Sequence, residues 1–130
     1  MGACVDQSDA NAIINAQLRS VSYPAITATK IRLGTNAPTA TVNMTELSGS
    51  GYTAGGSTIA WNAASAGATS NSGSVSWTNG GSTWSLVGLE IWDTAGPTRH
   101  LYGTWTGQPI SVAGSNTFTV AAAGVAYSLG

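Results

Sequence analysis

The segment "STWSLVGLEIWD", residues 82–93, decides the fold, because its apolar residues alternate with other residues and then change phase once. Trp84 and Leu86 occupy even positions, whereas Val87, Leu89 and Ile91 occupy odd ones. Successive side chains of a strand leave on opposite faces of the sheet, so one extra residue, a bulge near Leu86, would keep both groups on the buried face. The segment therefore predicts a long strand with one buried face, and we expect its other face to be exposed.

A second strand with the same alternation follows at residues 101–105, after the turn sequence "DTAGPTR". If the two strands form a hairpin, one register matches their faces. It pairs Ile91 with Leu101 and Leu89 with Gly103 on the buried face, and Trp92 with His100 and Glu90 with Tyr102 on the exposed face.

The period of two continues from residue 25 to the end of the chain, interrupted by turns rich in Gly, Asn and Pro. Eight or nine short strands of this kind predict an all-β fold, an antiparallel β-sandwich or a jelly-roll-like barrel. Four tryptophans share the parity of aliphatic neighbours and are predicted to lie in the core: Trp61, Trp77, Trp84 and Trp105. The other predicted inward sets are Ile31 and Leu33, Val42 and Met44, Ile59, Val75, Ile110 and Val112, Phe118 and Val120, and Val125, Tyr127 and Leu129.

One helical pattern precedes the strands, at about residues 8–20. Asp6 or Ser8 can cap its first turn, and Pro24 ends the segment. Its apolar residues recur at spacings of three and four and share one face: Ile13, Ile14, Leu18 and Val21. We therefore expect one N-terminal α-helix.

Length and composition limit the classes of protein to consider. A chain of 130 residues predicts a single domain, residues 1–130, with an arm and helix at 1–24 and a β-sandwich at 25–130. Only 7% of the residues are charged and the net charge is -1, which argues against a nucleic-acid partner. No apolar run approaches the roughly 20 residues of a membrane-spanning helix. One cysteine and one histidine exclude an internal disulfide and a four-ligand metal site.

Two carboxylates beside a tryptophan raise the possibility of a glycoside hydrolase. Glu90 and Asp93 are three residues apart, however, so their side chains leave an extended strand on opposite faces. Asp93 is expected to open a turn with Gly96 and Pro97. His100 has no serine nucleophile in an activated setting as a partner. We therefore predict a protein that is not an enzyme, with no catalytic residues and no cofactor.

The predicted outer face of the hairpin carries an aromatic patch. Trp92 would lie there beside His100 and Tyr102, and Glu90 would be a solvated or interface charge. An alternative is that the protein's own helix or N-terminal arm covers Trp92. With the helix face, the candidate interface comprises Ile13, Ile14, Leu18, Glu90, Trp92, His100 and Tyr102.

Several blocks occur in an order that resembles a family of small tailed-phage virion proteins. They are "ANAIINAQL" (residues 10–18), "KIRLGTNAPTATVNMTELSGSGYTAGGSTIAWNAAS" (30–65), "VGLEIWDTAG" (87–96) and "YGTWTGQPISVAGSNTFTVAAAGVAYSL" (102–129). Members go under the names tail fibre protein, minor tail protein or head decoration protein. The resemblance covers about 100 residues, and the "GYTAGG…I.W" and "VG.EIWD" blocks carry it.

The resemblance implies a non-enzymatic structural component of the virion, made in the host cytoplasm. The sequence has no long coiled coil, so a compact module that docks on a lattice fits its length better than a complete fibre. We expect a head decoration protein that binds the major capsid protein on the outer surface of the particle, and self-associates as a trimer or small ring. The alternatives are a tail fibre or minor tail protein that contacts the host surface, and a carbohydrate-binding module.

Overall fold

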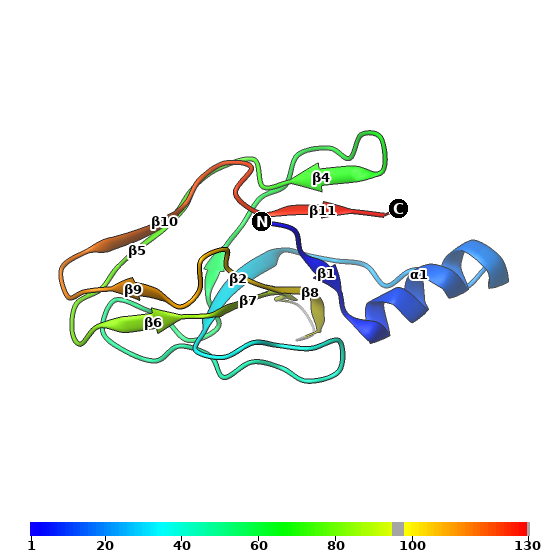
Figure 1. Ribbon diagram of the computed structural model, residues 1–130. Helices are drawn as coiled ribbons and strands as arrows, with labels where there is room; N and C mark the ends of the chain where they lie inside the picture. The colour runs from blue at the N-terminus through cyan, green and yellow to red at the C-terminus, as the bar shows by residue number, and fades with distance from the viewer. Residues whose placement is uncertain (95–97, 130) are drawn as a thin grey trace.

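The computed structural model describes residues 1–94 and 98–129, which form one N-terminal helix and eleven short strands (Figure 1). Every pairing between named strands is antiparallel. This confirms the predicted all-β, sandwich-like fold with one N-terminal helix. The elements are β1 (Cys4–Val5), α1 (Gln7–Arg19), β2 (Thr29–Gly34), β3 (Ser57–Thr58), β4 (Ala68–Ser70), β5 (Val75–Thr78), β6 (Trp84–Leu86), β7 (Gly88–Asp93), β8 (Arg99–Thr104), β9 (Ile110–Val112), β10 (Thr117–Val120) and β11 (Ala126–Ser128).

The strands form one larger sheet and three pairs. The larger sheet has the order β1-β8-β7-β2-β3, and the pairs are β10 with β5, β11 with β4, and β6 with β9. Two of the strand pairs, β5 with β10 and β6 with β9, lie at the end of the molecule away from α1 (Figure 1). The N-terminal arm joins the larger sheet to the β4–β11 pair, because the N–H of Ala3 donates to Ala126 O (2.8 Å) while β1 pairs with β8.

Helix α1 begins at one of its two predicted caps and ends one residue before the predicted range does. Asp6 is the N-cap, and its Oδ1 accepts the N–H of Ser8 at 2.9 Å. Ser20 ends the helix in the left-handed conformation, and the N–H of Val21 donates to Asn15 O. The observed helix starts one residue before the predicted range, within the usual uncertainty of helix ends.

The change of phase in residues 82–93 marks a change of strand partner. β6 pairs with β9, whereas β7 pairs with β2 on one side and β8 on the other. Between them, the N–H of Val87 donates to Gly34 O and its carbonyl accepts the N–H of Trp105, both at 2.9 Å. The apolar residues on both sides of Val87 are buried, as predicted: Trp84, Leu86, Leu89 and Ile91. The phase change is therefore real, but it lies at a crossing between two sheets.

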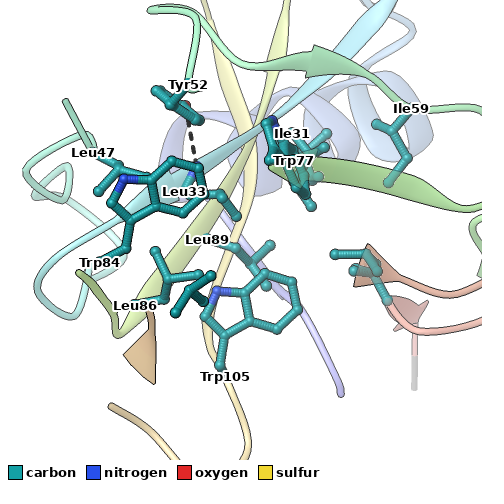
Figure 2. Close-up of a cluster of buried hydrophobic side chains, with 14 of the residues drawn as sticks. Ile31, Leu33, Leu47, Tyr52, Ile59, Trp77, Trp84, Leu86, Leu89 and Trp105 are labelled. Carbon is teal, nitrogen blue, oxygen red and sulfur yellow. Dashed lines mark hydrogen bonds between the residues drawn. The ribbon is translucent and has the colours of Figure 1, made fainter. Parts of the chain in front are cut away.

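The hydrophobic core gathers the inward residues of both the larger sheet and the pairs (Figure 2). Trp77, Trp84 and Trp105 are at most 7% exposed, and Trp61 packs against the cluster, partly buried. Phe118 contacts Trp105 edge-to-face, with ring centroids 5.3 Å apart. These positions confirm the core predicted from the tryptophans.

The inward orientation predicted for two apolar residues is wrong. Val42 is 61% exposed and Leu129 is 54% exposed. Residues 41–44 form no strand, so alternation does not govern that segment, and Leu129 lies just beyond the end of β11. Met44, by contrast, is buried as expected.

The segment 35–47 covers the face of β2 and β7 that the sequence predicted to be exposed. The N–H of Leu47 donates to Leu33 O at 2.8 Å, so the segment ends against β2. It approaches β7 so closely that a Cβ on Gly88 would lie 2.6 Å from the carbonyl oxygen of Asn36. At Gly34, Gly88 and Glu90 the second face of the central strands is therefore buried as well, whereas Lys30, Arg32 and Trp92 further along stay partly exposed.

Candidate functional site

Arg99 lies at the centre of a buried ionic cluster that joins three parts of the chain. Its Nε donates to Asp6 Oδ2 at 2.7 Å and its Nη1 donates to Glu90 Oε1 at 2.9 Å. The remaining donors reach the carbonyl oxygens of Thr39 (2.7 Å) and Val42 (3.0 Å). The cluster thus fastens the start of α1 and the covering segment to the sheet.

Glu90 belongs to this cluster, and the prediction that it is exposed is wrong. It is 2% exposed, and its carboxylate also accepts the N–H of Met44 and the Nε1–H of Trp92, each at 2.8 Å. Its parity is the predicted one, opposite Leu89 and Ile91. The covering segment, however, turns that face into interior, and Glu90 is not part of a surface.

The predicted hairpin register is correct in its first three pairs and wrong in the fourth. Leu89 pairs with Gly103, Glu90 with Tyr102 and Ile91 with Leu101, but Trp92 pairs with Arg99. The register shifts between Ile91 and Trp92, which leaves His100 as an extra residue. Arg99 therefore occupies the face predicted for His100.

His100 consequently faces α1, and the prediction of a surface aromatic residue beside Trp92 is wrong. It is 8% exposed, and its Nδ1 lies 2.9 Å from Asp9 Oδ1. Tyr23 donates its hydroxyl to the same carboxylate oxygen. Burial, followed by this bond to Asp9, raises the pKa of Tyr23 above its ordinary value. The trio Asp9, Tyr23 and His100 holds α1 and the chain after it against β8.

Trp92 and Tyr102 are both partly buried, and the chain's own arginines cover them. The guanidinium of Arg32 lies 4.2 Å from the Trp92 ring centroid, and that of Arg99 lies 5.1 Å from the Tyr102 ring centroid. The predicted patch of Trp92, His100 and Tyr102 is thus not assembled. This removes the row of exposed aromatic residues that a carbohydrate-binding module would need around Trp92.

The two carboxylates of the predicted strand do not converge. Glu90 points into the ionic cluster, whereas Asp93, three residues along β7, lines a cavity beside Tyr23 and His100. The turn expected of Asp93 with Gly96 and Pro97 involves residues 95–97, which lie outside the described part of the chain.

Helix α1 is attached near its first turn and exposes its later apolar residues. The N–H of Asp6 donates to His100 O at 2.8 Å, and Asp6 and Asp9 make the side-chain contacts described above. Further along, Ile14 is 52% exposed and Leu18 is 80% exposed; Val21, which follows the Ser20 cap outside the helix, is 50% exposed. Ile13 is partly buried. The far end of α1 projects beyond the sheets (Figure 1), so this apolar face is available to another molecule.

No group of three or more His, Cys, Asp or Glu side chains within residues 1–94 and 98–129 could hold a metal ion. In the same residues, no helix has the length and apolar character needed to cross a membrane.

The sequence reasoning missed Asp9, Tyr23 and Arg99 as structural partners. One feature of the sequence pointed to them: the chain has only nine Asp, Glu, Lys and Arg residues, so each retained charge is more often structural than in an ordinary protein. What the sequence does not show is which of these charges meet.

A β-rich chain with internally paired charges and an apolar helix face open to solvent has the features of a structural or docking protein. The sequence model of the family described as "Podophage GP4 fiber I protein gp80" matches residues 5–128. The chain therefore belongs to this family of phage fibre proteins, which confirms the resemblance to small virion structural proteins. A search of curated proteins found no match.

Proposed function

We propose that the chain is a non-enzymatic structural subunit of the virion and that it docks on a neighbouring virion protein through the apolar face of α1, formed by Ile14 and Leu18 and extended by Val21 just after the helix ends. The observation that carries this proposal is the 80% exposure of Leu18 on a helix anchored at its other end. Burying a leucine side chain contributes about 1.5–3 kcal/mol, which docking would recover.

Two positions in the particle fit such a subunit. The family description favours a fibre, where the partner would be a tail or fibre protein. A head decoration protein on the outer capsid surface is the second candidate. It is favoured by the shape of the chain, because its one helix in the described residues has 13 residues and offers no long stalk. Cryo-imaging of the particle distinguishes them, since density for the chain would lie on the tail or fibre in one case and on the capsid shell in the other.

Leu18→Glu is expected to lower the occupancy of the subunit in particles at least about tenfold, because it places a charge in the apolar contact. The isolated variant should unfold within about 0.5 kcal/mol of the wild type, since the side chain is exposed. Occupancy is measured by quantitative mass spectrometry of purified particles after complementation.

Val42→Glu is the matched control, because Val42 is also an exposed apolar residue, at 61%, but lies in the covering segment, which contacts α1 at its first residue, Gln7, and not at Leu18. It should be incorporated normally. Equal occupancy of Leu18→Glu and wild type would contradict docking through α1.

We further propose, as part of the same function, that the chain self-associates as a trimer or small ring. A sizing measurement on the isolated chain tests it directly. A ring whose contact uses α1 would dissociate in Leu18→Glu and persist in Val42→Glu.

A further inference from the structure

A polar cavity of about 460 Å³ opens between the loop 47–50 and the start of β6. This volume lies within the range of sites for small ligands. Two residues of its wall, Leu47 and Trp84, are buried. The others are exposed, and six of them carry hydroxyl groups: Thr35, Ser48, Ser50, Ser82, Thr83 and Ser85. Among the described residues, none that lines this cavity is charged, so its wall offers hydrogen bonds without a net charge.

The indole N–H of Trp84 is a hydrogen-bond donor without a protein partner. The side chain is 3% exposed, and its Nε1 makes no hydrogen bond with the residues that the structure describes. Nε1 of Trp77 and Nε1 of Trp105 are enclosed in the core, whereas Nε1 of Trp84 keeps surface that solvent can reach. In Figure 2 this nitrogen lies on the side of the ring away from Leu33 and Leu89. Because buried polar groups are almost always hydrogen-bonded, this N–H requires an acceptor from outside the core.

Gly49 places this donor on the wall of the cavity and keeps the approach to it open. Gly49 itself lines the cavity, and a Cβ at this position would lie 3.1 Å from Nε1 and 3.8 Å from Cδ1 of Trp84. The Nε1 edge of the indole therefore faces the loop and not the core. The loop is fixed in turn, because the N–H of Gly80 donates to Ser50 O at 2.9 Å and the N–H of Tyr52 donates to Gly49 O at 3.2 Å. The cavity is thus held in shape by the chain itself.

The six hydroxyl groups of the wall also make no hydrogen bond with the described residues. Exposed hydroxyls elsewhere in the chain pair with each other: Ser76 bonds to Thr119 and Thr78 bonds to Thr117, both at 2.9 Å. A hydroxyl can donate one hydrogen bond and accept two. The wall therefore matches a compact, neutral ligand that carries several donors and acceptors, one of which accepts the N–H of Trp84.

We propose that this cavity binds one ring of a neutral sugar. An oxygen of the sugar accepts the Nε1–H of Trp84, and the sugar hydroxyls exchange hydrogen bonds with the serines and threonines of the wall. The site differs from the aromatic patch predicted around Trp92, since it uses the edge of a buried indole and no exposed ring. Strand β6 lies at the end of the molecule away from α1 (Figure 1), so the proposal does not depend on docking through α1.

The test uses the full chain and records the NMR signals of the tryptophan indole N–H groups during titration with methyl glycosides of glucose, galactose, rhamnose and N-acetylglucosamine. At least one glycoside should bind saturably with a Kd on the order of 1 mM, as expected for a ligand of this size. It should move the signal of Trp84 while those of Trp77 and Trp105 stay in place. Tetrahydropyran-2-methanol keeps the ring but has one hydroxyl, and should bind about tenfold more weakly or less.

Trp84→Phe keeps an aromatic ring but removes the donor, and should weaken binding of the glycoside about tenfold. Trp105→Phe is the matched control, because it removes a donor that is enclosed in the core, and it should bind like the wild type.

A second pair of variants keeps the core untouched. Ser48→Ala combined with Ser82→Ala removes one exposed hydroxyl from each side of the cavity, should leave the fold intact and should weaken binding. Ser76→Ala combined with Thr119→Ala removes a hydroxyl pair outside the cavity and should bind like the wild type.

A further arm separates a free sugar from one ring of a glycan chain. Binding of the corresponding trisaccharide at least as tight as that of the glycoside supports a glycan, whereas exclusion of the trisaccharide supports a free sugar. The proposal is overturned if none of the four glycosides moves the Trp84 signal saturably, if tetrahydropyran-2-methanol binds equally well, or if the variant that lacks the hydroxyls of Ser48 and Ser82 binds the glycoside like the wild type.

Discussion

Arg99→Met is expected to lower the free energy of unfolding by about 3–5 kcal/mol, because it leaves two buried carboxylates without their partner. Arg99 is 4% exposed and bonds to Asp6, Glu90 and two backbone carbonyls. A loss of this size is a large part of the 5–15 kcal/mol that stabilise an ordinary domain. Urea unfolding followed by tryptophan fluorescence measures it.

Arg19→Met is the control for this prediction. Arg19 is exposed, its bond to Asn15 is long at 3.4 Å, and the change should cost at most about 0.5 kcal/mol. Arg99→Lys keeps the charge but loses the forked geometry, and should fall between the two. If the Met variants at positions 99 and 19 were equally stable, the ionic cluster would not stabilise the fold.

Acid should reduce the difference between wild type and Arg99→Met. Burial alone raises the pKa of Asp6, but its bonds to Ser8 and Arg99 outweigh burial and hold the pKa below the ordinary value of 3.8. A carboxyl with a lowered folded pKa contributes stability above its unfolded pKa and loses it as the pH falls through the folded value. The free-energy difference between the two proteins should therefore be smaller at about pH 3 than at neutral pH.

Asn79→Ala is expected to destabilise the fold by about 2–3 kcal/mol, because it leaves buried backbone groups unpaired. Asn79 is fully buried. Its side chain donates to the carbonyls of Ser82 and Val112, each at 2.8 Å, and accepts the N–H of Gly81 at 2.9 Å. The side chain thereby joins the β5–β6 turn to the end of β9. Thermal and urea unfolding both report the loss.

Asn79→Asp refines the interpretation, since it keeps the acceptor, loses both donors and places a charge in the interior. It should be at least as destabilising as Asn79→Ala. Asn116→Ala is the matched control, because Asn116 is exposed in a neighbouring turn. Near-equal stability of the Asn79 and Asn116 variants would show that the buried amide does not hold the turn.

Much of the hydrophobic core could be predicted from the sequence, because buried residues recur at the spacing of the strand or helix that carries them. Helix α1, the core tryptophans and the pairing of Ile91 with Leu101 all follow from spacings within short segments. The ionic cluster could not be predicted in this way. Asp6 lies 84 residues before Glu90, and Glu90 lies 9 residues before Arg99. No local pattern in the sequence relates positions so far apart.

The candidate site likewise has one part that the sequence predicts and one part that it does not. The apolar face of α1 follows from its helical period, whereas its exposure was decided by the packing of the rest of the chain. The positions of His100 and Arg99 depend on the register shift between Ile91 and Trp92. One extra residue at that point exchanges the faces of the two side chains, which alternation alone cannot foresee.

The sequence by itself determined the helix, the parity of β7 and of most residues in the core, because these depend on backbone geometry repeated over a few residues. Only the tertiary structure decided what lies opposite each face. The segment 35–47 covers one side of β7 and buries Glu90, and α1 meets His100 on the other. Alternation tells on which side a residue leaves its strand, whereas contacts between distant segments decide whether that side is solvent or interior.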